Sequence, residues 1–218
     1  MAVAFVDLAQ TCAPLVDVRT LAAVVSLESH FRPFAIRINS GLPLRVQPTS
    51  KAEAIERATA LAADHQDIQL GLGGIGMEEL RKLKLSISDA FDPCRNLKAT
   101  ATLLDGYYRL ALRAGANAAH AETVMLQSYY GRDDPSVGNM VRYDEQVRRE
   151  MVRLFPKLAS LSIAGARDEA PLDEPLDTQE PVAKSLPQAD ETTSWNVFTA
   201  QRRSSVLVFQ NDRSEQSE

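Results

Sequence analysis

The sequence predicts a mainly α-helical domain with a small β-hairpin, followed by a disordered C-terminal tail. Apolar residues recur at helical spacing through most of residues 1–160, and no alternation of strands and helices suggests a parallel sheet. Residues 161–194 instead are rich in proline and acidic residues. Because 44% of the chain is hydrophobic and 24% is charged, the composition as a whole is that of a folded protein.

The first predicted helix covers residues 20–31, with the sequence TLAAVVSLESHF. Its expected apolar face consists of residues at i, i+3, i+4, i+7 and i+10: Leu21, Val24, Val25, Glu28 and Phe31. The next segment, AIRINSGLPLRV at 35–46, alternates around Asn39-Ser40-Gly41 and predicts the hairpin, with Pro43 restricting its second strand to a sheet edge.

Further helices follow along the chain. Ser50 and Glu53 have the spacing of a capping box and open a predicted helix over 50–66. A glycine-rich turn at 71–76 precedes a short helix near 77–84, and the segment before this turn does not resemble a buried strand. The remaining predicted helices cover about 94–113, 116–129 and 137–155.

The C-terminal quarter has a different composition. Residues 164–194 contain eight acidic residues against Arg167 and Lys184, with four prolines and few large apolar residues. Such a segment buries too little apolar surface to offset its ordering entropy. We therefore expect three parts: a folded domain at 1–160, a disordered linker at 161–194, and a β-prone docking segment at 195–218, which contains WNVF and SSVLVF.

Composition excludes several function classes. The 24 basic and 29 acidic residues give a net charge of −5, which argues against nucleic acid as a partner. No apolar run reaches 18 residues, so we expect no membrane span. We expect no metal and no cofactor, because Cys12, Cys94 and the three histidines do not have metal-ligand spacing. The two cysteines are consistent either with buried free thiols or with one disulfide.

Glu28 breaks the apolar pattern of its helix, because it stands where Leu or Val is expected. A buried carboxyl group has a raised pKa and can act as a general acid near neutral pH. Alternatively, Glu28 pairs with Arg32 at i+4 or lies at the edge of the apolar face. The residues alone leave both interpretations open.

Two further features are candidate parts of a site. Gly71 to Gly76 match a G-x-G-x-x-G dinucleotide pattern, but the context is wrong, and close approach of the backbone to a ligand or helix explains the glycines better. Tyr129, Tyr130 and Tyr143 cluster near a helix end, where they could stack on sugars or form the edge of the core.

Four segments in order resemble the lytic transglycosylases with a goose-type lysozyme-like fold, specifically those of type IV secretion systems. VSLESHFRPFAI resembles the Glu-Ser motif, QLGLGGI the G-L-M-Q-I turn, FDPCRNLKATATLL the helix entry of the secretion subfamily, and SYYGRDDPSVGNMVRYDEQV the final tyrosine motif. The similarity covers about residues 5–158, and the WNVF and SSVLVF segments resemble the tail of some members.

The resemblance implies that Glu28 is the catalytic acid and base and that Ser29 is its hydrogen-bonding neighbour. It implies substrate-binding positions at Leu72, Ile75 and Tyr129, and we expect Gly73 and Gly74 of the same turn and Tyr130 and Tyr143 of the tyrosine cluster to bind substrate with them. The chain departs from the family where Gly73-Gly74 replaces Met-Gln, where Gly76 replaces Asn and where Tyr130 replaces Asn. The missing side-chain amides put substrate affinity or subsite preference in question.

The implied function is a peptidoglycan lytic transglycosylase that opens the cell wall locally for the secretion apparatus. Its partners would be glycan strands and other secretion components, the latter through residues 195–218. A periplasmic location follows from the resemblance, although residues 1–14 are not typical of a signal peptide. In that compartment, Cys12 and Cys94 are expected to form a disulfide. A non-catalytic wall-binding factor and a hydrolytic lysozyme on the same fold remain alternatives.

Overall fold

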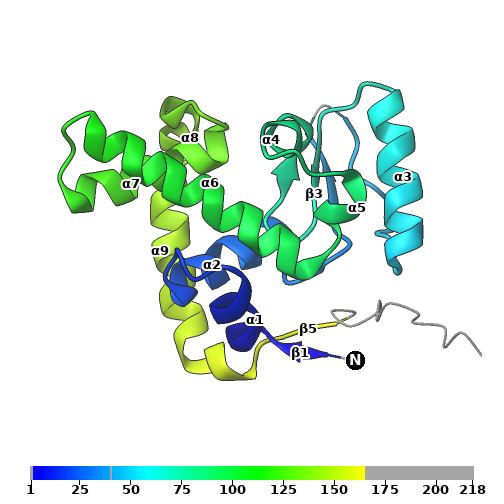
Figure 1. Ribbon diagram of the computed structural model, residues 1–218, viewed down its shortest axis with the longest axis horizontal. Coiled ribbons are helices and arrows are strands. Elements are labelled where there is room, and N and C mark those ends of the chain that lie inside the picture. The colour runs from blue at the N-terminus through cyan, green and yellow to red at the C-terminus, as the bar shows by residue number, and fades with distance from the viewer. Residues whose placement is uncertain (1, 40, 165–218) are drawn as a thin grey trace, which may run out of the picture. The chain divides into compact units, whose positions relative to one another are not determined.

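A computed structural model describes residues 2–39 and 41–164, which are mainly helical with small antiparallel sheets, as the sequence predicts (Figure 1). The helices are α1 (Phe5–Cys12), α2 (Val18–Ser29), α3 (Lys51–Ala63), α4 (Met77–Lys82), α5 (Ile87–Ala90), α6 (Pro93–Arg113), α7 (Ala118–Gly131), α8 (Pro135–Met140), α9 (Tyr143–Leu154) and the 3-10 helix η1 (Phe155–Ser160). The strands are β1 (Val3–Ala4), β2 (Ile36–Ile38), β3 (Ile68–Leu70), β4 (Ile75–Gly76) and β5 (Ser162–Ile163). The predicted linker and docking segment lie outside the described residues, apart from 161–164.

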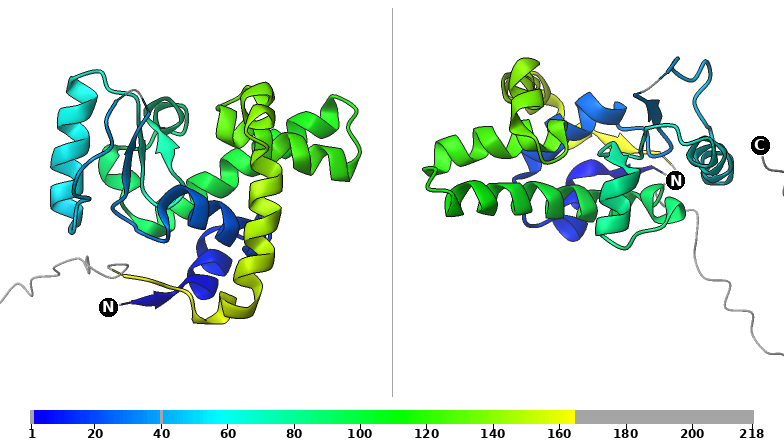
Figure 2. Two further views of the ribbon diagram at one scale, coloured as in Figure 1. Left: turned by 180° about the vertical axis from the view of Figure 1, so that it is seen from behind. Right: turned by 90° about the horizontal axis from the view of Figure 1, so that it is seen from above.

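Helix α2 is buried on nearly all sides and lies between two apolar clusters. On one side, Leu21 and Val25 pack with α1 and with Leu97 of α6. On the other, Val24 joins a cluster with Leu104 of α6 and with residues of α7 and α9. Figure 2 shows α6 and α7 running side by side, with α9 crossing near α2. The last turn of α2, which carries Glu28, is therefore fixed within the core.

The strand pairing differs from the predicted hairpin at 35–46. Strand β2 pairs antiparallel with β3, and β3 pairs antiparallel with β4, so the hairpin is the one that closes through the glycine-rich turn. The side chain of Gln47 accepts a hydrogen bond from the Ile36 N–H and donates one to the Ile36 carbonyl, each at 2.9 Å. This amide occupies the backbone groups that the second strand of a 35–46 hairpin would need.

The expectation that AADHQDIQ at 62–69 is no buried strand was wrong at its end, because β3 buries Ile68 and Leu70 while Gln69 points to the other face. The strand is antiparallel to both neighbours, so the surroundings of the glycines remain unlike those of a parallel dinucleotide-binding unit.

The predicted helix at 137–155 is two helices, α8 and α9. Arg142 between them has a left-handed conformation with φ of 53°, which an uninterrupted helix excludes. The short helix near 77–84 likewise ends at Lys82, because Lys84 has φ of 56°, and α5 follows it. In α3, Ser50 caps the helix as expected, but the Glu53 side chain reaches the Thr49 N–H rather than the N-cap N–H.

The chain ends of the described domain meet each other. Strand β1 pairs antiparallel with β5, and α1, which directly follows β1, buries Phe5 in the core. Cys12 at the end of α1 forms a disulfide with Cys94 in the first turn of α6, with 5.3 Å between the two Cα atoms. None of the helices in the described ranges is long and apolar enough to cross a membrane.

Candidate active site

Glu28 lies in the last turn of α2 and is buried, with 9% of its surface exposed. Tyr143, the first residue of α9, donates its hydroxyl to Glu28 Oε1 at 2.6 Å. Arg37 of β2 forms an ion pair with Glu28 Oε2 and donates to the Glu28 carbonyl oxygen at 3.0 Å. The ion pair of Glu28 is therefore with Arg37 and not with Arg32, which donates to the Ser29 carbonyl oxygen instead.

The surroundings of Glu28 act on its pKa in opposite directions. Burial, the largest effect, removes water from the carboxylate and raises the pKa. The Arg37 charge and the Tyr143 hydroxyl lower it, because both stabilise the ionised form. The pKa of Glu28 is raised overall. The group is thus more readily protonated than an ordinary glutamate, and it has partners that stabilise it once it has lost its proton.

An open cleft of about 220 Å³ lies beside Glu28. Its walls come from the end of α2, from β2 and the segment after it, and from the glycine-rich turn: Leu27, Glu28, His30, Arg32, Ala35, Ile36, Arg37, Pro43, Gln47, Gln69, Gly71 and Gly74. Because Glu28 is one of the lining residues, a ligand in the cleft would lie beside it. No cluster of His, Cys, Asp and Glu among the described residues could hold a metal ion.

The glycine-rich turn packs directly on the glutamate. Gly74 has φ of +63°, and a Cβ there would lie 2.8 Å from Glu28 Oε2. A Cβ at Gly73 would lie 1.9 Å from the Thr100 hydroxyl oxygen. Neither position has room for a side chain in this packing, and Gly74 also needs the left-handed backbone that glycine adopts readily. The backbone of the turn therefore approaches Glu28 more closely than a chain with side chains could.

Two groups from the helical side hold this turn. The Tyr129 hydroxyl of α7 donates to the Gly73 carbonyl at 2.6 Å. Asn96 of α6 is fully enclosed: its amide donates to the Leu70 and Ala90 carbonyls at 3.1 and 2.8 Å and accepts from the Gly73 N–H at 2.8 Å. Asn96 thus ties the turn to the end of β3 and the end of α5 through one side chain.

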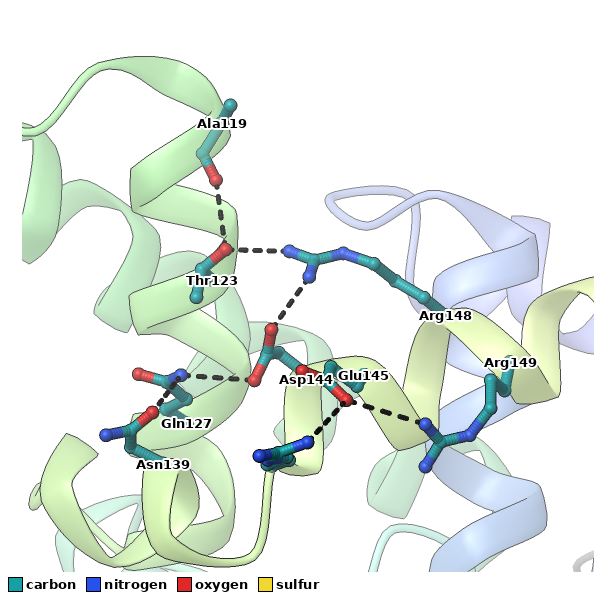
Figure 3. Close-up of polar contacts among 9 residues, drawn as sticks. Ala119, Thr123, Gln127, Asn139, Asp144, Glu145, Arg148 and Arg149 are labelled. Carbon is teal, nitrogen blue, oxygen red and sulfur yellow. Dashed lines mark hydrogen bonds and ion pairs between the residues drawn. The ribbon is translucent and has the colours of Figure 1, made fainter.

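A polar network fixes the start of α9, and with it Tyr143 (Figure 3). Asp144 is buried and accepts from Gln127 at 3.1 Å and from Arg148 at 2.7 Å. Arg148 also donates to the Thr123 hydroxyl on α7 at 2.7 Å. These contacts hold the first turn of α9 against α7. Tyr143 lies in this turn, and its hydroxyl reaches Glu28 of α2.

The sequence-derived site residues do not all gather at the cleft. Tyr130 lies against Tyr143, with ring centroids 5.0 Å apart. Ser29 is buried and donates its hydroxyl to the Val25 carbonyl at 3.0 Å, within α2. Leu72 is buried in the cluster that contains Leu21 and Val25 of α2, and Ile75 is buried in a separate cluster with strands β2 and β3. The structure brings Glu28, Gly73, Gly74, Tyr129 and Tyr143 together.

Sequence reasoning missed Arg37 and Asn96. Arg37 lies between two isoleucines in a three-residue strand, and nothing local to it indicates a partner nine residues earlier. Asn96 had a usable signal, because it lies on the apolar face of α6 next to Leu97, in the register of the core. A buried amide at such a place indicates bonds to backbone groups.

The chain is similar to curated proteins named virB1. No family model matches the chain, and no solved structure matches it. The type IV secretion system protein virB1 of Brucella suis biovar 1 is 42% identical over 110 residues, 50% of this chain and 46% of that protein. Protein virB1 of Agrobacterium fabrum is 30% identical over 205 residues, 92% of this chain and 73% of that protein.

The chain belongs to the VirB1 family of type IV secretion system proteins. It spans about half the length of the Brucella VirB1 proteins, at 46% of each. Protein virB1 of Rhizobium radiobacter matches a similar share, with 35% identity over 105 residues. Glu28 and the cleft beside it are thus the candidate active site of a VirB1-family protein.

Proposed function

We propose that this VirB1-family chain is a peptidoglycan lytic transglycosylase. It would cleave the β-1,4 bond between N-acetylmuramic acid and N-acetylglucosamine and close a 1,6-anhydro ring on the muramoyl residue. One observation carries the proposal: a buried glutamate with a raised pKa opens into a cleft and is held by a tyrosine and an arginine. This is the arrangement that a general acid needs near neutral pH.

In the first step of the proposed reaction, protonated Glu28 gives its proton to the glycosidic oxygen as the bond from that oxygen to the muramoyl C1 breaks. The Glu28 carboxylate that forms is stabilised by the Tyr143 hydroxyl and the Arg37 charge. In the second step, the carboxylate takes the proton of the muramoyl 6-hydroxyl as its oxygen bonds to C1. Glu28 is then protonated again, and no water is consumed.

A single glutamate is sufficient for this scheme, unlike the paired carboxylates of most glycosidases. The groups around Glu28 fit the double role. Burial favours the acid form before the first step, and the two hydrogen-bond donors favour the base form before the second. A carboxyl group with only one of these influences would be suited to only one of the two steps.

The family membership supports a place for this activity. We propose that the chain works in the periplasm and opens the cell wall locally where the secretion system assembles. Its partners would then be peptidoglycan glycan strands and other secretion components. Residues 1–160 would form the catalytic domain, 161–194 a linker, and 195–218 a docking segment for those components.

The test is Glu28→Gln, which removes the acid while keeping the shape of the side chain. Glu56→Gln is the matched control, because Glu56 is exposed on α3. Mass spectrometry of digested sacculi should show 1,6-anhydro ends with the wild type and with Glu56→Gln. Their release should fall by about 10²–10⁴-fold with Glu28→Gln, with an unchanged circular dichroism spectrum.

The products also separate the alternatives. Reducing ends in place of anhydro ends would indicate a hydrolytic lysozyme. No cleavage by a wild-type protein that binds sacculi would indicate a wall-binding or assembly factor. Anhydro products that persist with Glu28→Gln would refute the assignment of the acid.

A further inference from the structure

Glu79 of α4 is a buried acid that the proposed mechanism does not use. Only 4% of its surface is exposed, and neither of its carboxyl oxygens has a hydrogen-bond partner in the described part of the chain. Gln69 of β3 also has a buried side-chain oxygen without a partner. Burying a carboxyl group without a partner is costly, so a group that persists in this state indicates a partner that the free chain does not supply.

These unpartnered oxygens belong to one small cavity beside the cleft. The cavity measures about 10 Å³, and its lining includes Gln69, Gly74, Gly76, Glu79 and Arg132. Gln69 and Gly74 also line the cleft that contains Glu28, so the two spaces adjoin. The volume is that of about one water molecule, which fits a hydroxyl or an ammonium group but not a sugar ring.

Gly76 makes this arrangement possible. A Cβ at position 76 would lie 2.3 Å from Glu79 Oε2 and 3.5 Å from the guanidinium carbon of Arg132. The carboxyl group of Glu79 therefore occupies the space that any side chain at position 76 would enter. This is the position where the sequence resemblance expects a side-chain amide, so one polar group has taken the place of another.

We propose that the cavity is a subsite in which Glu79 and Gln69 accept hydrogen bonds from one donor group of the bound glycan, a hydroxyl or an ammonium. The subsite rests on the proposed function, since it presumes a glycan in the adjoining cleft. The carboxyl oxygens of Glu79 and the amide oxygen of Gln69 are hydrogen-bond acceptors. Arg132 also lines the cavity and donates to Asp67 at 2.7 Å, but it makes no hydrogen bond to the oxygens of Glu79 or Gln69.

The test measures binding without cleavage, in the Glu28→Gln protein. Calorimetry would use two probes, the hexasaccharide of N-acetylglucosamine and its de-N-acetylated counterpart, which carries ammonium groups. Glu79→Gln replaces one acceptor oxygen with a donor and should weaken binding by about five- to tenfold. Glu78→Gln is the matched control on the same helix, because the Glu78 side chain is 69% exposed. It should leave binding unchanged.

The pattern over the two probes identifies the donor. A loss with both probes indicates a hydroxyl, and a loss with the ammonium probe alone indicates an amine. Glu79→Gln should also leave the melting temperature unchanged or raise it, because neither carboxyl oxygen has a hydrogen-bond partner to lose, whereas replacing a purely structural residue would lower it.

Binding of both probes within twofold of the parent value would overturn the subsite, as would a lowered melting temperature with Glu79→Gln. In either case the proposed function would stand if the parent protein binds the probes. A parent protein that binds neither probe would overturn the subsite and count against the proposed function together.

Discussion

Replacing Asn96 by Asp tests how the glycine-rich turn is held beside Glu28. The substitution keeps the shape of the side chain and its acceptor for the Gly73 N–H. It removes the two amide hydrogens that now bond to the Leu70 and Ala90 carbonyls. In their place, a carboxylate oxygen faces two carbonyl oxygens in a fully buried position.

The magnitude follows from these contacts. Each buried carbonyl that loses its donor costs about 1–3 kcal/mol, so Asn96→Asp should lower the free energy of unfolding by about 2–6 kcal/mol. That is a large share of the roughly 5–15 kcal/mol typical of a native domain. The ionised carboxylate of the introduced aspartate has no hydrogen to donate to these carbonyls, whereas the protonated carboxyl group has one. The loss should therefore shrink as the pH is lowered and the introduced carboxyl group takes up a proton.

Urea unfolding of both proteins at pH 7 and pH 5 measures the effect. Asn117→Asp is the matched control, because exposed Asn117 caps α7 by accepting from the His120 N–H, which aspartate does equally well. Its stability should stay within about 0.5 kcal/mol of the wild type. A loss below about 1 kcal/mol for Asn96→Asp, or one independent of pH, would show that Asn96 does not hold the turn as described.

Two further predictions concern the surroundings of Glu28 and the disulfide. Arg37→Gln removes a charge that lowers the pKa of Glu28, so the alkaline limb of the kcat/KM profile for cleavage should move to higher pH; a limb that stays in place or moves down would contradict the ion pair. The combined Cys12→Ala and Cys94→Ala variant opens a link across 82 residues and should lose about 4.5 kcal/mol by the chain-entropy relation, measured by urea unfolding against the oxidised wild type. Equal midpoints would show that the link does not constrain the unfolded chain.

Local signals predicted most of the longer helices, although not α1, α5 or the break between α8 and α9, and they did not predict the sheet. Helix α6 begins with Asp92 as N-cap and Pro93 at its first position, and both signals are visible in the sequence. Strand β2 pairs with β3 across the whole of α3, and each strand has only three residues. The sequence also offered a nearer partner for β2, and only the side chain of Gln47 explains why that partner is not used.

The residues of the candidate site likewise include some that the sequence reveals and some that it does not. Glu28 could be found because apolar residues recur at helical spacing along its helix, and a carboxyl group at one of these positions interrupts the pattern. Tyr129 and Tyr143 are visible in the sequence as part of a tyrosine cluster, and the family resemblance adds a role for Tyr129. Arg37 depends on which segments meet in space, because it reaches Glu28 from a strand, and no spacing in the sequence indicates that contact. Glu79 is instead local to Gly76: it lies three residues after this N-cap glycine of α4 and fills the space beside it, although the sequence does not mark it as buried.

Two glycines of the turn, Gly73 and Gly76, each face a polar side chain. In the sequence, Gly73 and Gly76 stand where the resembled family has larger side chains, and this difference puts substrate affinity in question. In the structure, each faces a neighbour that fills the vacated space: the Thr100 hydroxyl at position 73 and the Glu79 carboxyl group at position 76. Restoring a side chain at either position without changing its neighbour would place atoms in overlap. The glycines and their neighbours therefore form matched pairs, in which a side chain added at one position requires a change at the other.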